Sequence, residues 1–125
     1  MRIDQVTPFL HVPDLSRALH LLCEVLPFAV TYSEPGYAYL ELGDSGLRVL
    51  EEPGRVIAPD GKARMTVYVD VSDVDALYAS LRGRLCDLAE GDVEPPRNKP
   101  WGQREFMVRL PDGDWIAFGQ AGRRD

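Results

Sequence analysis

The stretch TPFLHVPDL, residues 7–15, has a counterpart in TVYVDVSDV, residues 66–74, which lies 59 positions further along the chain. In both stretches apolar residues occupy alternate positions, which predicts a strand with one buried face. Each stretch then reaches an aspartate, Asp14 or Asp73, and aspartate is a frequent helix N-cap. Apolar residues at helical spacing follow both aspartates. The sequence therefore predicts two copies of a unit that begins with a strand and a helix.

Further strand-like segments follow each predicted helix. In the first half they cover residues 29–32, 36–42 and 47–51, and in the second half residues 104–110 and 114–119. Gly, Pro, Asp and Ser between them are typical of turns. When the turn residue Gly46 is placed over Gly113, Val49 falls over Ile116 and Leu50 over Ala117. We therefore predict two βαβββ modules, residues 3–52 and 64–120, joined by a linker over residues 53–63. Residues 88–101 contain three prolines and are predicted to form a surface or binding loop.

Length and charge restrict the class of protein. A chain of 125 residues supports one domain, here residues 1–125, and no apolar run is long enough to cross a membrane. The net charge is −6 and the basic residues are scattered, so we expect no nucleic-acid partner. The start of the chain has no basic region followed by an apolar run, which favours a cytoplasmic location. Neither of the two cysteines has another Cys or a His at the spacing of a metal-binding motif.

The segment Pro100-Trp101-Gly102-Gln103-Arg104-Glu105-Phe106, followed by Pro111-Asp112-Gly113 and Phe118, carries a family resemblance. It resembles the corresponding segment of bleomycin-resistance-type proteins, which belong to the vicinal oxygen chelate superfamily with glyoxalase I, extradiol dioxygenases and fosfomycin-modifying enzymes. The resemblance implies an α+β fold in which two βαβββ modules form a cup-shaped sheet with the helices outside. It also implies a homodimer. The chain departs from the family at Leu26-Pro27-Phe28, where relatives often have Leu-Gly-Phe, so the end of the first helix must differ locally.

Strand alternation divides the residues of this fold between the core and the cup. Core positions are predicted for Leu10, Val12, Ala38, Leu40, Leu42, Ile116 and Phe118, and also for Phe28 and Phe106. The opposite face is predicted to carry Thr7, Phe9, His11, Tyr37, Tyr39, Glu41, Thr66, Tyr68, Asp70, Trp115 and Ala117. Glu105 is predicted to face solvent.

The resemblance places the positions that hold metal ligands in metal-dependent relatives at Thr7, Leu50, Thr66 and Ala117. None of these side chains is a strong donor for a divalent cation, so we expect no metal, no cofactor and no enzymatic activity. His11 also points toward the cup, but it lies four residues beyond the usual ligand position and is interpreted as a rim histidine.

An aromatic lining remains as the candidate functional feature. Aromatic rings stack on flat ligands and attract cations through their faces. The predicted ligand-binding residues are Trp101, Tyr37, Tyr39, Tyr68, Phe9, Trp115, Glu41, Asp70 and Arg104. For the three tyrosines, filling the core is an equal alternative to a place in a ligand site or a subunit interface. The carboxylates suit a basic ligand, whereas Arg104 or Arg109 suits an acidic one.

The sequence thus predicts a protein that binds and sequesters an antibiotic without a metal, giving resistance or self-protection. The expected partner is a flat aromatic, cationic small molecule, either bleomycin-type or another natural product such as mitomycin or a quinoline-bearing peptide. One alternative is a metal-dependent lyase or dioxygenase of the same superfamily. Another is an accessory module that binds a biosynthetic partner.

Overall fold

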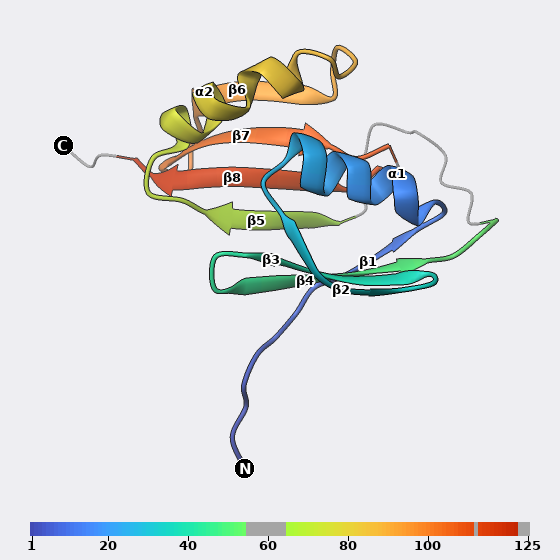
Figure 1. Cartoon of the computed structure of the whole chain (residues 1–125). Helices are drawn as coiled ribbons and strands as arrows, with labels where there is room; N and C mark the ends of the chain where they lie inside the picture. The colour runs from blue at the N-terminus through green and yellow to red at the C-terminus, as the bar shows by residue number, and fades with distance from the viewer. Residues whose placement is uncertain (55–64, 112, 123–125) are drawn as a thin grey trace. The chain divides into compact units, whose positions relative to one another are not determined.

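The structure, a computed structural model, describes residues 1–54, 65–111 and 113–122. Contacts divide the chain into two units, residues 1–57 and 58–125, and each unit contains one βαβββ module. The elements of the first module are β1 (Phe9–Val12), α1 (Leu15–Leu19), the π-helical turn η1 (His20–Val25), β2 (Ala29–Glu34), β3 (Tyr37–Leu42) and β4 (Ser45–Glu51). Those of the second are β5 (Thr66–Asp70), α2 (Val74–Leu85), β6 (Val93–Asn98), β7 (Gln103–Arg109) and β8 (Trp115–Ala121). The predicted repeat of two βαβββ modules is confirmed (Figure 1).

The two sheets have the same topology. Their strand orders are β1-β4-β3-β2 and β5-β8-β7-β6, and in each the first strand runs parallel to the last while the other pairs are antiparallel. The predicted linker, residues 53–63, lies mostly outside the described residues, as does Asp112 of the predicted turn before β8.

The start of each helix is held by two side chains. Asp14 and Asp73 each accept a hydrogen bond at 3.0 Å from the backbone N–H three residues on, as their N-cap positions predict. Glu51 and Gln120, near the ends of β4 and β8, accept from the N–H of the first helical residue. The last strand of each module is thereby tied to the helix of the same module.

The first helix ends before Pro27. Its last turn is π-helical, and the N–H of Leu26 reaches the carbonyl of Leu21 at 2.9 Å. Leu26 itself is extended, with φ −94° and ψ 163°, because the ring of a following proline disfavours the helical conformation.

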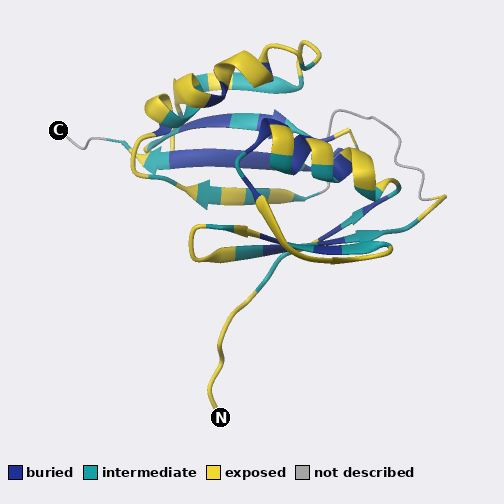
Figure 2. Ribbon diagram, in the orientation of Figure 1, coloured by how far each residue is buried: buried dark blue, intermediate teal, exposed yellow. Residues whose placement is uncertain are grey.

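The core of each module lies between its sheet and its helix. In the first module Leu10, Val12, Ala38 and Leu40 are buried as predicted, whereas Leu42 is half-buried. In the second the predicted core residues Phe106, Ile116 and Phe118 are fully buried, and the central strands β7 and β8 are the most deeply buried elements (Figure 2). The other face of each sheet, turned away from the helix of its own module, is called the open face.

The prediction of a loop over residues 88–101 was wrong in part. Residues 93–98 form β6, the edge strand next to β7. Pro95 and Pro96 lie where the register with β7 shifts, between Glu94 and Arg97. Proline has no N–H to donate to a ladder, and an edge strand with an irregular register tolerates it.

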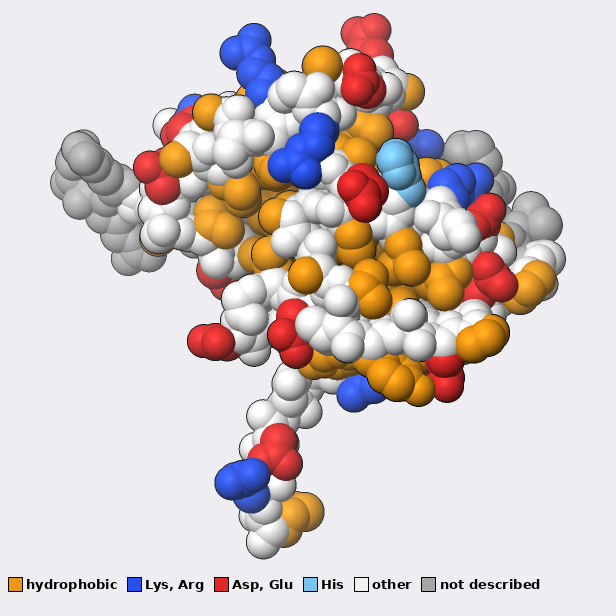
Figure 3. Space-filling model, in the orientation of Figure 1, with side chains coloured by type: hydrophobic (Ala, Val, Ile, Leu, Met, Phe, Trp, Pro, Cys, Tyr) orange, Lys and Arg blue, Asp and Glu red, His pale blue; other side chains and the backbone are white. Residues whose placement is uncertain are grey.

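None of the helices in the described ranges is long and apolar enough to cross a membrane. On the face that Figure 3 shows, Lys and Arg side chains are separated by acidic and neutral ones.

Candidate functional site

The open face of the second module is built around a tyrosine that lies over a glycine. Tyr68 on β5 and Gly119 on the neighbouring β8 lie on the same face of the sheet, and a Cβ atom on Gly119 would overlap the Tyr68 hydroxyl and lie 2.6 Å from Cζ. The glycine therefore leaves the space that the tyrosine ring occupies. The Tyr68 hydroxyl is 3.3 Å from Gln103 Oε1 and 3.4 Å from Glu105 Oε1, both on β7.

Glu105 is a candidate site residue of this module that sequence reasoning missed. It was predicted to face solvent, but only 4% of its surface is exposed, so that prediction was wrong. Because Phe106 fills the core, its neighbour Glu105 points to the open face, where Tyr68 and Trp101 contact its carboxylate. The burial of Phe106 was predicted, and it could have placed Glu105 on this face.

Trp101 is held by a hydrogen bond at one edge of its ring and by a cation at one face. Its indole N–H donates to Glu105 Oε1 at 3.0 Å, and the Lys99 ammonium lies over the ring, 5.6 Å from its centre. The residue nevertheless remains 64% exposed. A large ring whose orientation is fixed by a hydrogen bond is a stacking surface that loses little freedom when a ligand binds.

The environment of Tyr68 keeps its hydroxyl protonated. Burial raises the pKa of Tyr68 above its usual value, and the negative charges of Glu105 and Asp70 raise it further. The phenol therefore remains a donor to Glu105 over the physiological pH range. Asp70 is exposed at the end of β5, and Trp115 is half-buried at the start of β8.

The open face of the first module carries the predicted aromatic residues of that half. Phe9 is 38% exposed, with its ring centre 6.1 Å from that of Tyr37. The Tyr39 hydroxyl accepts from Gln5 Nε2 at 3.0 Å and lies over Gly46, where a Cβ atom would overlap it. Glu41 is exposed near the end of β3.

Arg48 lies among these rings and was not predicted. Its Nη1 donates to the Tyr37 hydroxyl at 2.6 Å, its Nε to Thr7 Oγ1 at 3.4 Å, and its guanidinium carbon lies 5.1 Å from the Tyr39 ring centre. Strand alternation was the available signal, because Leu47 and Val49 on either side of it are buried.

The register of the sheets corrects the alignment of the two modules. The repeat of 59 positions makes Leu10 on β1 equivalent to Val69 on β5. In the parallel pairing with the last strand of each module, Leu10 lies opposite Val49 and Val69 lies opposite Phe118. Arg48 therefore corresponds to Ala117, and Leu50 corresponds to Gly119. Placing Leu50 over Ala117 was wrong by two residues, because the connection before β8 is longer than the one before β4.

The positions that the resemblance assigns to metal ligands thus hold Thr7, Arg48, Thr66 and Ala117. The Thr7 hydroxyl accepts from Arg48, and His11 Nδ1 is 2.5 Å from Glu52 Oε1. Within residues 1–54, 65–111 and 113–122, no three His, Cys, Asp or Glu side chains come together in a way that could hold a metal ion.

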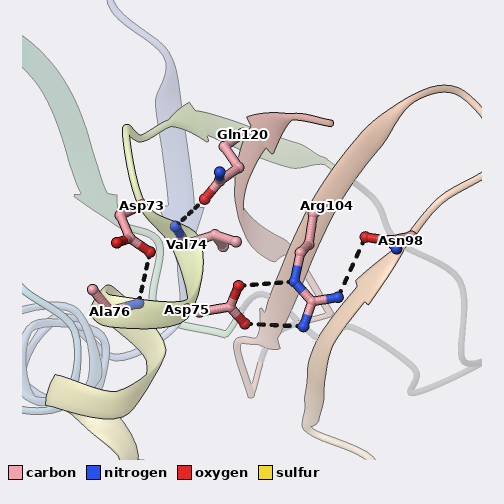
Figure 4. A network of polar contacts seen from close by, with 7 residues as sticks. All are labelled: Asp73, Val74, Asp75, Ala76, Asn98, Arg104 and Gln120. Carbon is pink, nitrogen blue, oxygen red and sulfur yellow. Dashed lines mark hydrogen bonds and ion pairs between the residues drawn. The ribbon is translucent and has the colours of Figure 1, made fainter. Parts of the chain in front are cut away.

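Arg104 lies apart from the other candidates. On β7 it alternates with Glu105 and so points to the face covered by α2, where Nε and Nη2 each lie 2.9 Å from a carboxylate oxygen of Asp75 (Figure 4). Nη1 is 3.3 Å from Asn98 Oδ1. This bidentate pair lowers the pKa of Asp75, mainly through the hydrogen bonds that Arg104 donates to it. The structure therefore gives Arg104 the role of joining α2 to β7, and we leave it out of the site proposed for ligand binding.

A separate hollow of about 230 Å³ lies between the end of α2, residues 88–91 and β6. None of the predicted site residues lines it.

Comparison with known proteins identifies the family and the fold of the chain. A family model described as Glyoxalase/Bleomycin resistance protein/Dioxygenase superfamily matches residues 2–118. No curated protein matches the sequence. Among solved structures, the chain is similar to the bleomycin-binding protein from bleomycin-producing Streptomyces verticillus, complexed with copper(II)-bleomycin. The TM-score is 0.75 at 22% identity, over 98% of this chain and 99% of that one.

Two further solved structures are similar. TioX from Micromonospora sp. ML1 has a TM-score of 0.71 at 28% identity, over 94% of this chain and 98% of that one. The fosfomycin resistance protein FosX from Mesorhizobium loti has a TM-score of 0.69 at 17% identity, over 97% of this chain and 94% of that one. The fold is thus shared by proteins that differ widely in sequence.

Proposed function

Because the chain belongs to the glyoxalase/bleomycin resistance protein/dioxygenase superfamily, we propose that it binds a flat aromatic antibiotic that carries a basic group and sequesters it without a metal. The proposed role is resistance or self-protection. Candidate ligands are bleomycin-type compounds, mitomycin-like compounds and quinoline-bearing peptides. The proposal includes a homodimer, as the family resemblance implies.

The arrangement of Trp101 on Glu105 carries this proposal. The indole edge is fixed by its hydrogen bond at 3.0 Å, while most of the ring surface remains in solvent. A ligand ring that stacks on it gains about 0.5–1.5 kcal/mol beyond the free energy of area burial. Several such contacts together with one charge pair are sufficient for micromolar to nanomolar affinity, which corresponds to about 8–12 kcal/mol.

The carboxylates of the same face favour a basic ligand. Glu105 is buried and accepts hydrogen bonds from Trp101 and Tyr68, yet no Lys, Arg or His in the described ranges forms an ion pair with it. Asp70 adds a second negative charge near Tyr68. A cationic group of the ligand would neutralise this charge, and such charge-assisted hydrogen bonds are stronger than neutral ones.

The residue types at the positions of metal ligands support sequestration over catalysis. Threonine and alanine are poor donors, and Arg48 brings a positive charge to the position that corresponds to Ala117. The superfamily includes glyoxalases and dioxygenases, so a metal-dependent enzyme is the alternative that must be tested.

Isothermal titration calorimetry with metal-free bleomycin, mitomycin C and a quinoline-bearing peptide antibiotic tests the proposal, alongside tryptophan fluorescence. We expect saturable binding of at least one compound to the wild-type protein and at least tenfold weaker binding to Trp101→Ala. Trp101→Phe keeps a stacking ring but loses the indole N–H, so it should bind with intermediate affinity. Glu105→Gln should weaken binding of a cationic compound, while Glu90→Gln, at an exposed position beside the hollow, should not.

Two results would overturn the proposal. If no compound of the panel binds and a pull-down captures a biosynthetic protein, the chain is an accessory module. If the purified protein contains stoichiometric Zn, Fe, Mn or Ni that chelators remove together with a measurable activity, it is an enzyme of the superfamily.

A further inference from the structure

The position of Arg48 on the open face of the first module is fixed by three neighbouring groups. Its side chain projects from β4 away from the core that Leu47 and Val49 fill. The Tyr37 hydroxyl accepts from Nη1, the Thr7 hydroxyl from Nε, and the Tyr39 ring lies under the guanidinium. The group is therefore held in one orientation before any ligand arrives.

The charge of Arg48 is not neutralised by these contacts. In the part of the chain that the structure describes, no carboxylate forms an ion pair with Arg48, and both of its hydrogen bonds go to hydroxyl groups. A guanidinium has five N–H donors in one plane, and these match the two oxygens of a carboxylate. Several donors on Arg48 thus remain available on a protein whose net charge is −6.

The surroundings of this cation are flat and aromatic. The rings of Phe9 and Tyr37 have centres 6.1 Å apart, and Tyr32, which is 55% exposed, lies 6.2 Å from Tyr37. A carboxylate attached directly to a flat ring would place its charge at the guanidinium and its ring against these side chains. A small inorganic anion would bind the guanidinium but would make no contact with the rings.

We propose that Arg48 is the anion-binding end of a subsite for a planar aromatic carboxylate on the sheet β1-β4-β3-β2. The inference rests on the proposed function, because it gives the flat ligand an acidic group in addition to the basic group proposed above. It also assigns to Arg48 a role in specificity: the subsite prefers an acid over the amide of the same shape.

Naphthalene-2-carboxylate, the neutral naphthalene-2-carboxamide and the cationic naphthalen-2-ylmethylammonium test the subsite as probes of equal ring size. We expect the wild-type protein to bind the carboxylate about tenfold more tightly than the amide, as one charge-assisted pair allows, and the ammonium most weakly at Arg48. Arg48→Gln should remove the preference for the carboxylate, and Arg48→Lys should keep part of it. Arg82→Gln, an exposed arginine on α2, is the matched control and should bind like the wild type. Two-dimensional NMR identifies the tyrosine signals that shift, and thermal unfolding verifies that each variant is folded.

Equal affinity of the wild type for the carboxylate and the amide would overturn the subsite, and so would a preference that persists in Arg48→Gln. The subsite is likewise wrong if Arg48→Gln unfolds at much lower temperature while no carboxylate binds the wild type, because Arg48 then serves stability through its contacts with Tyr37, Thr7 and Tyr39. Binding of an antibiotic at Trp101 is measured independently. If an antibiotic binds and the carboxylate preference is absent, the subsite alone fails. If the preference is present and no antibiotic binds, sequestration fails.

Discussion

Replacement of Gly119 by alanine tests whether the glycine exists to make room for Tyr68. The new Cβ atom would overlap the Tyr68 hydroxyl and lie 2.6 Å from Cζ, where ordinary contact is 3.4–4 Å. Tyr68 is 40% exposed, so its ring can swing outward. It would then lose its hydrogen bonds to Glu105 and Gln103 and its packing on the sheet.

The expected change in the free energy of unfolding is the difference between two opposing effects. Loss of the Tyr68 hydrogen bonds and packing costs about 1–2 kcal/mol of unfolding free energy. Alanine at a position without positive φ stabilises by about 0.4–1 kcal/mol, because it reduces the entropy of the unfolded chain. Gly119→Ala should therefore destabilise the wild type by about 1 kcal/mol and lower its melting temperature by about 4 °C. In a Tyr68→Ala background the same substitution should stabilise by about 0.4–1 kcal/mol.

Urea unfolding of the two single variants and the double variant measures this change of sign. Gly46→Ala in the first module is the matched control, since its Cβ atom would overlap the Tyr39 hydroxyl in the same way. Because this glycine lies on the other module, Gly46→Ala should leave binding at Trp101 unchanged. An identical effect of Gly119→Ala in both backgrounds would refute the reasoning, because the glycine would then have no connection with Tyr68.

Two further predictions concern ionisable groups away from the site. Arg104 holds the pKa of Asp75 below its usual value, and a lowered carboxyl pKa contributes stability that is present above the unfolded value of about 4 and is lost as pH falls through the folded one. The stability difference between the wild type and Arg104→Gln should therefore be largest at neutral pH and shrink in acid, as urea unfolding at several pH values would show; a difference independent of pH would contradict the pairing. Burial raises the pKa of Cys23, with a further contribution from Glu24, whereas Cys86 is exposed. Iodoacetamide at pH 8 should label Cys86 first, and mass spectrometry that finds Cys23 labelled faster would contradict its burial.

The repeat and the faces of the strands could be predicted from sequence because the side-chain period of a strand is two. The pattern around Leu10 and Leu40 assigned Phe9 and Tyr39 to the opposite face, and the structure agrees. The caps at Asp14 and Asp73 depend on contacts within one turn, so local sequence was sufficient for them as well.

Features that depend on distant contacts could not be predicted in the same way. The burial of Glu105 requires Trp101 and Tyr68 to lie over it, and an isolated strand pattern does not contain that cover. The correspondence of Arg48 with Ala117 depends on the lengths of two connections, which glycine positions alone did not reveal. The strand β6 was missed because prolines usually interrupt strands, and only its edge position makes them acceptable.

The register also shows where the open faces of the two modules differ in charge. Tyr37 pairs with Leu50 in the first module, and Glu105 pairs with Gly119 in the second, so Tyr37 and Glu105 take equivalent places.

Gly119 makes room for the contact between Tyr68 and the acidic Glu105 on the open face of the second module. Because Gly119 has no side chain, Tyr68 can lie on the sheet and reach the Glu105 carboxylate. In the first module Leu50 takes the place of this glycine, and Phe9, which is equivalent to Tyr68, stays 38% exposed beside Tyr37.

In the first module the charged group is Arg48 on β4, one strand away from Tyr37, which is equivalent to Glu105. Arg48 occupies the place of Ala117, and the Tyr37 hydroxyl that takes the position of the carboxylate accepts its hydrogen bond. The two open faces thus share their backbone and their aromatic character but differ in the sign of the group at their centre. A charged ligand can distinguish them by this sign, and for this reason the Glu105→Gln and Arg48→Gln variants should lose affinity for opposite classes of probe.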